Sequence, residues 1–255
     1  MHIPMSIQLK LGETLIQLET DVPAWPADLQ GLLPVFRSVT DDLVKIAIDA
    51  ASSQHRTISC KAGCGACCHQ AVPVSEPEAH RLRDVVDAMA EPRRSVVQAR
   101  FAAAMDVFRD TGLLQDMFQR PRSVDDIPRV MAVLHAYYAK WHPCPFLENG
   151  SCSIYDERPL ICREFMVSSP AEKCSNIEGE GVERLVVPSR PSRALVMIAS
   201  QQHESREAVL PLIQILEWTS ENRDLSEELF APEWVALLGA ALQNKANESL
   251  QIGEL

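Results

Sequence analysis

The stretch CKAGCGACCH at residues 60–69 places the thiols of Cys60, Cys64, Cys67 and Cys68 in one short loop. A second group follows about eighty residues later and consists of Cys144, Cys152, Cys162 and Cys174, so the two groups account for all eight cysteines. Disulfides are rare in reducing compartments, and clustered thiols there indicate metal or redox chemistry rather than covalent cross-links. The sequence therefore predicts that sulfur from both groups binds metal ions.

The composition describes an ordinary globular chain. Its 255 residues, 46% of them hydrophobic, can bury one sizeable core. The N-terminal residues alternate polar and apolar side chains and lack the features of a secretion signal, and no later stretch approaches eighteen consecutive apolar residues. We therefore expect a cytoplasmic protein without a membrane partner. The formal net charge of −11 also disfavours nucleic acid as a partner.

The flanking sequence predicts a mainly α-helical fold that opens with a small β-hairpin at about 6–20. Apolar residues alternate with polar ones there, and Gly12-Glu13 offers a two-residue turn. Ser75 and Glu78 form a capping-box signature at the start of a helix. Helical spacing of apolar residues continues to residue 141. Beyond the second cysteine group, the sequence predicts a short strand at Val186-Val187 and helices near 192–203, 206–221 and 232–244. We expect residues 1–255 to form a single domain in which two cysteine-rich loops, 60–69 and 142–174, bind metal.

The first loop has the spacing of a metal-binding knuckle. Cys64 and Cys67 are separated by two residues and can turn both sulfurs toward one ion, while the neighbouring glycines permit a tight backbone. Cys67 and Cys68 are adjacent, so their side chains diverge, and one of them serves a second site or simply packs. Buried, unreactive thiols are the alternative interpretation. Four cysteines flanked by glycine rather than by apolar residues disfavour that alternative.

The second group combines a turn with a short helix. Asn149-Gly150 predicts a tight turn that brings Cys144 and Cys152 together. Asp156 is predicted to cap a helix that has Pro159 in its first turn and Cys162 further in. Arg158 and Arg163 are near enough to lower the pKa of these thiols, although arginines in an acidic protein also commonly form surface ion pairs.

The identity of the metal stays open at this point. Eight thiolates can form two four-thiolate zinc sites, one [4Fe-4S] cluster with one zinc site, or one cluster with spare redox thiols. His69 and His142 each lie near a cysteine and can replace a sulfur ligand, although packing or hydrogen bonding is the commoner role of such histidines. The remaining histidines carry no such signal.

The two groups contain the motifs Cys64-x-x-Cys67-Cys68, Cys144-Pro-Phe-Leu, Gly150-x-Cys152, Ile154-Tyr155 and Arg158-Pro159-x-x-Cys162-Arg163-x-Phe165. In these motifs the chain resembles the YkgJ-type cysteine-cluster family, which is described as zinc- or iron-chelating and includes the flagellin lysine N-methylases. The resemblance implies that the eight cysteines bind metal, and the family's methylase branch implies a [4Fe-4S] cluster, S-adenosylmethionine and a protein or peptide substrate. In the family the first spacing is usually Cys-x-x-Cys-x-x-Cys-Cys, whereas three residues separate Cys60 from Cys64 here.

The longer first spacing also matches a different class of enzyme. Cys60-x3-Cys64-x2-Cys67 is the cluster-binding triad of radical S-adenosylmethionine enzymes, in which three thiolates leave one iron open for the cofactor. Those enzymes usually need a β/α barrel, and this sequence lacks the recurrent strand and helix alternation of one. No Gly-x-Gly-x-x-Gly follows a predicted strand, which disfavours a Rossmann-type methyltransferase.

Two functional hypotheses remain. In the first, zinc or an iron–sulfur centre joins two distant loops, and the protein is a binding module, a metal sensor or a metal carrier. In the second, the chain is an iron–sulfur, S-adenosylmethionine-dependent protein-lysine methyltransferase. The sequence alone leaves open whether the protein is an enzyme.

Overall fold

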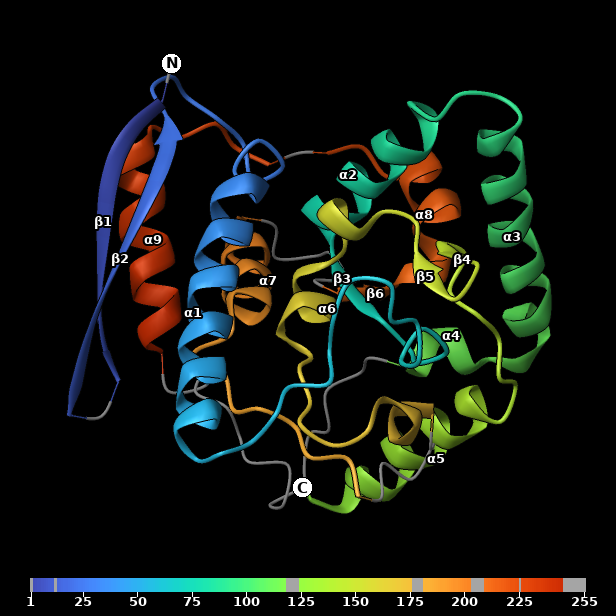
Figure 1. Cartoon of the computed structure of the whole chain (residues 1–255). Coiled ribbons are helices and arrows are strands. Elements are labelled where there is room, and N and C mark those ends of the chain that lie inside the picture. The colour runs from blue at the N-terminus through green and yellow to red at the C-terminus, as the bar shows by residue number, and fades with distance from the viewer. Residues whose placement is uncertain are drawn as a thin grey trace.

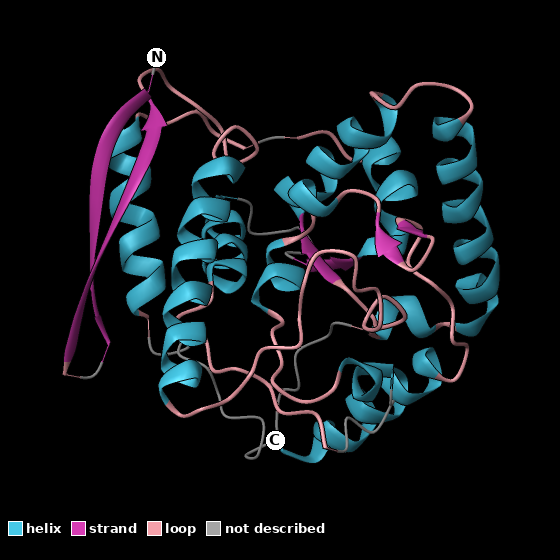
Figure 2. Cartoon of the chain, viewed as in Figure 1, coloured by secondary structure: helices cyan, strands magenta, loops and turns pink. Residues whose placement is uncertain are grey.

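The computed structural model describes residues 2–11, 13–117, 124–175, 181–202, 209–224 and 226–244. Helices dominate these residues, and the strands form a long N-terminal hairpin and two much smaller pairs (Figures 1 and 2). The predicted mainly α-helical fold with an N-terminal hairpin is thus confirmed. None of the described helices combines the length and the apolar composition that crossing a membrane requires.

The hairpin consists of β1 (His2–Leu11) and β2 (Thr14–Pro23), which pair antiparallel with Ile7 opposite Leu18. It is longer than the predicted range of about 6–20. Ile7, Leu9 and Leu18 are buried, because the alternating pattern gives the hairpin one apolar face. The predicted turn at Gly12-Glu13 includes Gly12, which lies outside the described residues.

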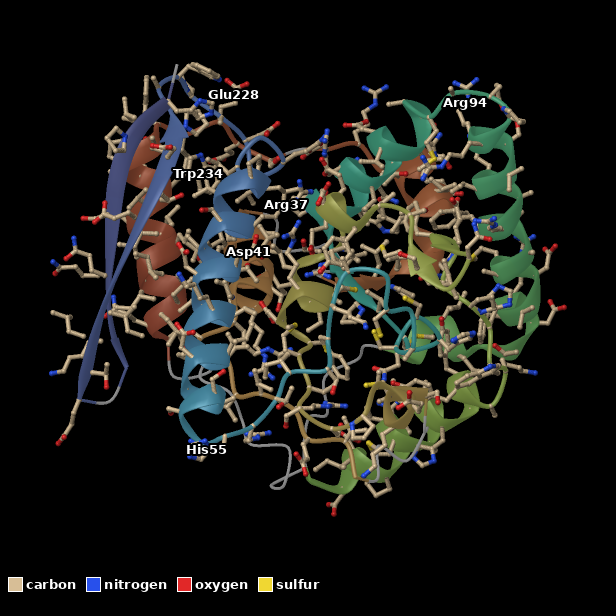
Figure 3. All side chains as sticks on the ribbon, viewed as in Figure 1. Arg37, Asp41, His55, Arg94, Glu228 and Trp234 are labelled. Carbon is tan, nitrogen blue, oxygen red and sulfur yellow. The ribbon has the colours of Figure 1, made fainter. Side chains whose placement is uncertain are left out.

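The apolar face of the hairpin belongs to a core shared with four helices. These are α1 (Leu33–Ser53), α6 (Leu160–Glu164), α7 (Pro191–Gln202) and α9 (Ala231–Gln243), and Figure 1 shows α9 beside the hairpin with α1 next to it. The Trp234 indole N–H on α9 donates to the Ala27 carbonyl over 2.7 Å, so the helix is also tied to the chain that follows β2 (Figure 3). Leu160 belongs to this core, which places the start of α6 in the hairpin half of the molecule.

The other half of the molecule surrounds a second core. It is formed by α2 (Glu76–Asp87), α3 (Arg93–Phe108), α8 (Ile215–Glu221) and the two-stranded pair of β3 (Pro73–Ser75) with β6 (Val209–Pro211). Cys144 and Cys152 pack against this core. A third cluster joins α4 (Leu113–Asp116) and α5 (Ile127–Tyr138) to the end of α3, where Phe108 stacks on Tyr137 with ring centroids 4.4 Å apart.

Short elements complete the described chain. The strands are β4 (Leu147–Glu148) and β5 (Ser151–Cys152), and the 3₁₀ turns are η1 (Arg109–Thr111), η2 (Val124–Asp126), η3 (Tyr155–Glu157), η4 (Ala171–Ser175) and η5 (Leu212–Gln214).

The capping box at the start of α2 is confirmed, and it does more than cap one helix. The backbone N–H and the hydroxyl of Ser75 donate to one Glu78 oxygen over 3.0 and 2.7 Å, while the backbone N–H of Leu160 donates to the other over 2.8 Å. Glu78 thus accepts hydrogen bonds at the first turns of both α2 and α6. The predicted N-cap at Asp156 is wrong, because Tyr155–Glu157 forms a 3₁₀ turn and α6 begins at Leu160, after the extended Pro159.

A second buried carboxylate joins α6 to α7. Glu164 accepts hydrogen bonds from the backbone N–H and the hydroxyl of Ser192 over 2.7 and 2.6 Å, and its other partner is Arg190 at 3.1 Å. The carboxylate therefore occupies the N-terminal end of α7, where backbone N–H groups lack partners within the helix.

Predictions for the C-terminal region are partly confirmed. The helices predicted at 192–203 and 232–244 correspond to α7 and α9. The helix predicted at 206–221 is wrong in its first half, because Val209–Pro211 pairs with β3 and α8 begins only at Ile215; residues 203–208 lie outside the described residues. The strand predicted at Val186-Val187 is also wrong, since the bridge in this region joins Arg184 to Val167.

Candidate metal centre

The two cysteine loops lie directly against each other. The backbone N–H of Cys144 donates to the carbonyl of Cys68 over 2.7 Å. A Cβ at Gly65 would collide with the carbonyl oxygen of Gly150 and with the side chain of Leu147. Glycine at position 65 is therefore what allows the first loop to approach the turn of the second.

That turn has the conformation predicted from its sequence. Asn149 and Gly150 have φ values of 50° and 76°, and they connect β4 to β5 with Leu147 opposite Cys152. Two consecutive residues with positive φ are typical of a tight hairpin turn. The backbone N–H of Leu147 donates to the Cys144 carbonyl over 2.9 Å, so Cys144 and Cys152 are held in the same small unit.

Cys67 lies within electrostatic range of thiols from both groups. Burial raises the pKa of Cys60, Cys144, Cys152, Cys162 and Cys174, and charge on Cys67 raises the pKa of each of them further. Such an effect acts over a longer range than a metal–sulfur bond, so these five thiols lie in the same region as Cys67 without forming a metal-ligating group among the described residues. The largest effect on Cys67 itself is a hydrogen bond with the Cys68 side chain, which also raises its pKa. All eight predicted cysteines are free thiols.

Burial further disfavours ionisation of these thiols, which are already protonated at neutral pH at their ordinary pKa. It raises the pKa of Cys144 to about 12 and that of Cys174 to about 11, and it raises the pKa of Cys162 as well. A thiolate needs hydration or a nearby positive charge, and a buried site supplies little of the first. These thiols ionise readily only when a cation is bound next to them.

Two arginines supply positive charge to the thiols. The Arg158 guanidinium lies 3.9 Å from the centre of the Tyr155 ring, and it opposes the effect of burial on the pKa of Cys60, Cys152 and Cys162. Arg184 acts in the same way on Cys174. Arg158 was predicted to do so, but Arg184 was not, because it lies ten residues beyond the last cysteine and outside any motif.

Arg163 has a structural role instead of the predicted electrostatic one. Its guanidinium forms an ion pair with Asp41 of α1 at 3.0 Å and donates to the carbonyl of Asp156. The side chain is only 9% exposed. It therefore attaches α6 to α1 (Figure 3, where Asp41 is labelled), in an ion pair whose arginine is buried and not on the surface as the alternative interpretation had it.

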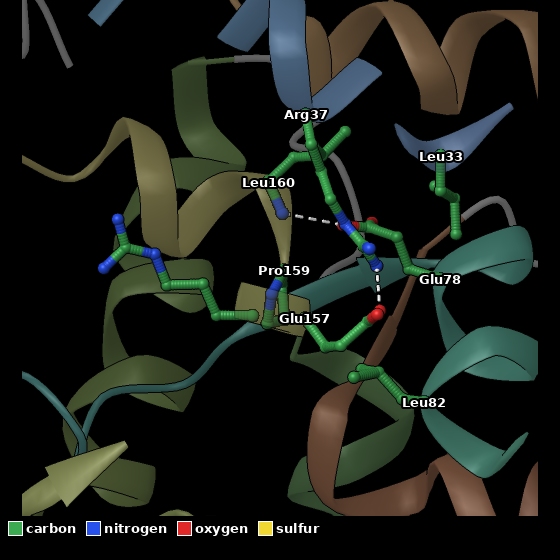
Figure 4. A pocket seen from close by; sticks show the side chains of 8 residues that line it. Leu33, Arg37, Glu78, Leu82, Glu157, Pro159 and Leu160 are labelled. Atoms are coloured by element: carbon green, nitrogen blue, oxygen red, sulfur yellow. Dashed lines mark hydrogen bonds and ion pairs between the residues drawn. The ribbon is translucent and has the colours of Figure 1, made fainter. Parts of the chain in front are cut away.

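The segment between Cys152 and Cys162 is clamped between α1 and α2. Glu157 forms ion pairs with Arg37 of α1 at 2.6 Å and Arg81 of α2 at 2.7 Å, and a small pocket beneath them is lined by Leu33, Leu82 and Pro159 (Figure 4). The hydrogen bond with Arg81 is the main cause that lowers the pKa of Glu157 to about 2. This clamp holds Glu157, directly before Arg158, while the hydrogen bond from Leu160 to Glu78 holds the backbone after it.

The histidines near the cysteines lie close together. His69 stacks on Trp141 with ring centroids 4.3 Å apart and an interplanar angle of 5°. Burial lowers the pKa of both His69 and His142, and charge on His69 lowers that of His142 further, so the two imidazoles are neighbours. His69 Nδ1 is buried and has no hydrogen-bond partner among the described residues.

The described residues contain no group of three or more His, Cys, Asp or Glu side chains in an arrangement that could hold a metal ion. The chemistry of the donors nevertheless fits zinc and iron, because thiolate and imidazole are the ligands that these metals take in proteins.

Comparison with known proteins gives one match. Residues 59–180 match the model of the CxxCxxCC family, whose description is "Putative zinc- or iron-chelating domain". No curated protein and no solved structure matches the chain. The matched range contains all eight cysteines, Arg158 and both histidines of the site. This match supports the predicted resemblance to a zinc- or iron-chelating cysteine-cluster family.

Proposed function

We propose that the chain binds zinc or iron through its eight cysteines and that the metal joins loop 60–69 to loop 142–174. The observation that supports this proposal best is the hydrogen bond from the backbone N–H of Cys144 in the second loop to the carbonyl of Cys68 in the first, which holds the two loops against each other. Ligands from both loops convert the free energy of metal binding into free energy of folding. The metal then acts as a cross-link between segments far apart in the sequence.

The surroundings of the thiols support the same function. Several thiolates around one or two divalent ions carry excess negative charge, which is costly to bury unless positive groups lie nearby. Arg158 and Arg184 supply such groups from the 153–159 segment and from the chain beyond Cys174. If the metal is an iron–sulfur cluster, it would supply electron-transfer chemistry, and these arginines would stabilise its negative charge.

Anaerobic purification followed by metal and sulfide analysis tests the proposal. We expect zinc or iron in wild type, and loss of both metal and solubility in Cys64→Ser and Cys162→Ser, with Ser59→Ala as a control that retains both. A colourless protein that contains zinc supports a structural cross-link. A brown protein that contains iron and sulfide supports a cluster. Wild-type protein without bound metal, which also binds none when metal is added, would refute the proposal.

The methyltransferase alternative has its own readout. If the purified protein contains an iron–sulfur cluster, adding S-adenosylmethionine should change its absorption and EPR spectra when the cofactor binds to an open iron. An unchanged spectrum supports a structural or electron-transfer role.

We also propose that residues 1–255 form one domain, since Leu160 and Leu185 from the cysteine region share a core with the hairpin.

A further inference from the structure

We propose that His69 is a metal ligand, so that the centre combines sulfur with one imidazole nitrogen. This inference rests on the proposed function, because it names a ligand of the same centre. Nothing in the family description assigns a role to this histidine.

The first argument is the state of the imidazole. His69 Nδ1 is one of few buried side-chain polar atoms without a hydrogen-bond partner in the part of the chain that the structure describes. Buried polar atoms are nearly always paired, and each exception calls for an explanation such as a bound ion. Coordination of a metal by Nδ1 would satisfy this nitrogen.

The second argument is that the imidazole ring is held in place by a residue with an unfavourable backbone conformation. The stack with Trp141 fixes the plane of the imidazole. Trp141 is 46% exposed and its φ is 48°, a left-handed conformation that is unusual for a bulky residue. Burial of the indole does not explain this arrangement, whereas orientation of a ligand does.

The third argument is location. His69 directly follows Cys68, whose carbonyl accepts the hydrogen bond from Cys144, so the imidazole lies at the junction of the two loops. The side chains of the adjacent Cys67 and Cys68 are hydrogen-bonded to each other rather than diverging, so His69 directly follows a pair of thiols that are in contact. A nitrogen from this next residue can complete a site that two sulfurs leave with open positions.

The same arguments do not apply to the neighbouring His142. Its ring packs edge-on against Phe108 with centroids 6.3 Å apart, and Phe108 belongs to the third hydrophobic cluster. This contact explains its position through packing alone. His69 is therefore the histidine to test.

Cobalt(II) is the probe for the experiment, because its visible spectrum distinguishes sulfur-only from mixed sulfur and nitrogen coordination. Metal-free wild type, His69→Ala and the control His135→Ala are titrated with cobalt(II) anaerobically, and X-ray absorption is measured on the loaded samples. We expect an imidazole contribution in wild type and in the control. In His69→Ala we expect that contribution to disappear, the ligand-field bands to shift, and the affinity to fall at least about tenfold.

A second pair of variants tests the stack. Trp141→Ala should weaken cobalt binding while Trp141→Phe retains most of it, and His69→Cys should restore tight binding with a sulfur-only spectrum. If His69→Ala does not fold, the X-ray absorption of wild type decides alone. Metal-loaded wild type with sulfur-only coordination would refute the role of His69 and leave the proposed function intact. Wild type that binds no metal at all would refute the proposed function itself.

Discussion

Gly65 packs so tightly against the carbonyl of Gly150 that a single added methyl group would force the two cysteine loops apart. The glycines come from different loops and lie between the cysteines that we expect to bind metal. Contact between these loops therefore depends on the absence of a side chain at one position.

Substitution at this contact should destabilise the protein. We expect Gly65→Ala to lower the free energy of unfolding by about 1–3 kcal/mol, the usual cost of overpacking, and to weaken metal binding because the loops separate. Urea denaturation and a metal-binding titration measure the two effects. Gly239→Ala on α9 is the matched control, because a Cβ there meets only an ordinary contact at 3.6 Å. Equal stability of the two variants would contradict this explanation.

Glu78 should contribute more to stability than an ordinary capping residue. Glu78→Ala leaves donors at the starts of both α2 and α6 without their acceptor, so we expect a loss of about 2 kcal/mol or more. Urea denaturation measures it. Asp87→Ala removes an exposed ion pair with Arg83 and should cost no more than about 0.5 kcal/mol. A loss for Glu78→Ala that is no larger than this would show that α6 does not depend on the carboxylate of α2.

The clamp at Glu157 predicts a pH dependence. In the folded protein the pKa of Glu157 is lowered from 4.5 to about 2. The hydrogen bond with Arg81 is the largest cause, the positive charge of Arg37 adds to it, and partial burial opposes the shift. A carboxyl with a lowered pKa stabilises the fold above its unfolded pKa, and this contribution is lost as pH falls toward the folded value. We expect wild type to be more stable than Glu157→Gln at pH 6 and the difference to shrink between about pH 5 and pH 2. Thermal unfolding across this range measures the difference, and a constant difference would argue against the clamp.

Metal binding should release protons. Burial raises the pKa of Cys144 to about 12 and that of Cys174 to about 11, so these thiols are protonated in the metal-free protein at neutral pH. Because a metal binds the thiolate, its affinity should rise with pH across the neutral range. Calorimetric titrations in buffers of different ionisation enthalpy count the protons released. Binding with no proton release would mean that these buried thiols are not ligands.

Local signals in the sequence were sufficient for much of this fold. The alternation in the hairpin, the capping box at Ser75 and the turn at Asn149-Gly150 each depend on a few neighbouring residues, and the structure confirms them. The predicted start of α6 was wrong because the contact that caps this helix is not local. The backbone N–H of Leu160 donates to Glu78, which lies 82 positions away in the sequence, and no pattern around Asp156 reveals that partner.

The candidate site divides in the same way. The cysteines and Arg158 lie inside a recognisable spacing, so sequence analysis could select them. Arg184 and the stack of His69 on Trp141 are products of tertiary packing. The first half of the helix predicted at 206–221 also failed because the partner strand β3 lies far away in the sequence.

Helix α6 is only five residues long, yet three of them are attached to separate parts of the molecule. Leu160 is bound to α2 through Glu78, Arg163 to α1 through Asp41, and Glu164 to α7 through Ser192. Cys162 lies in the middle of this helix, so its backbone is held in place from both sides. Any shift of its sulfur on taking up or releasing an ion would be transmitted as a pull on three larger helices, so the filled and empty states should differ well beyond the loops themselves.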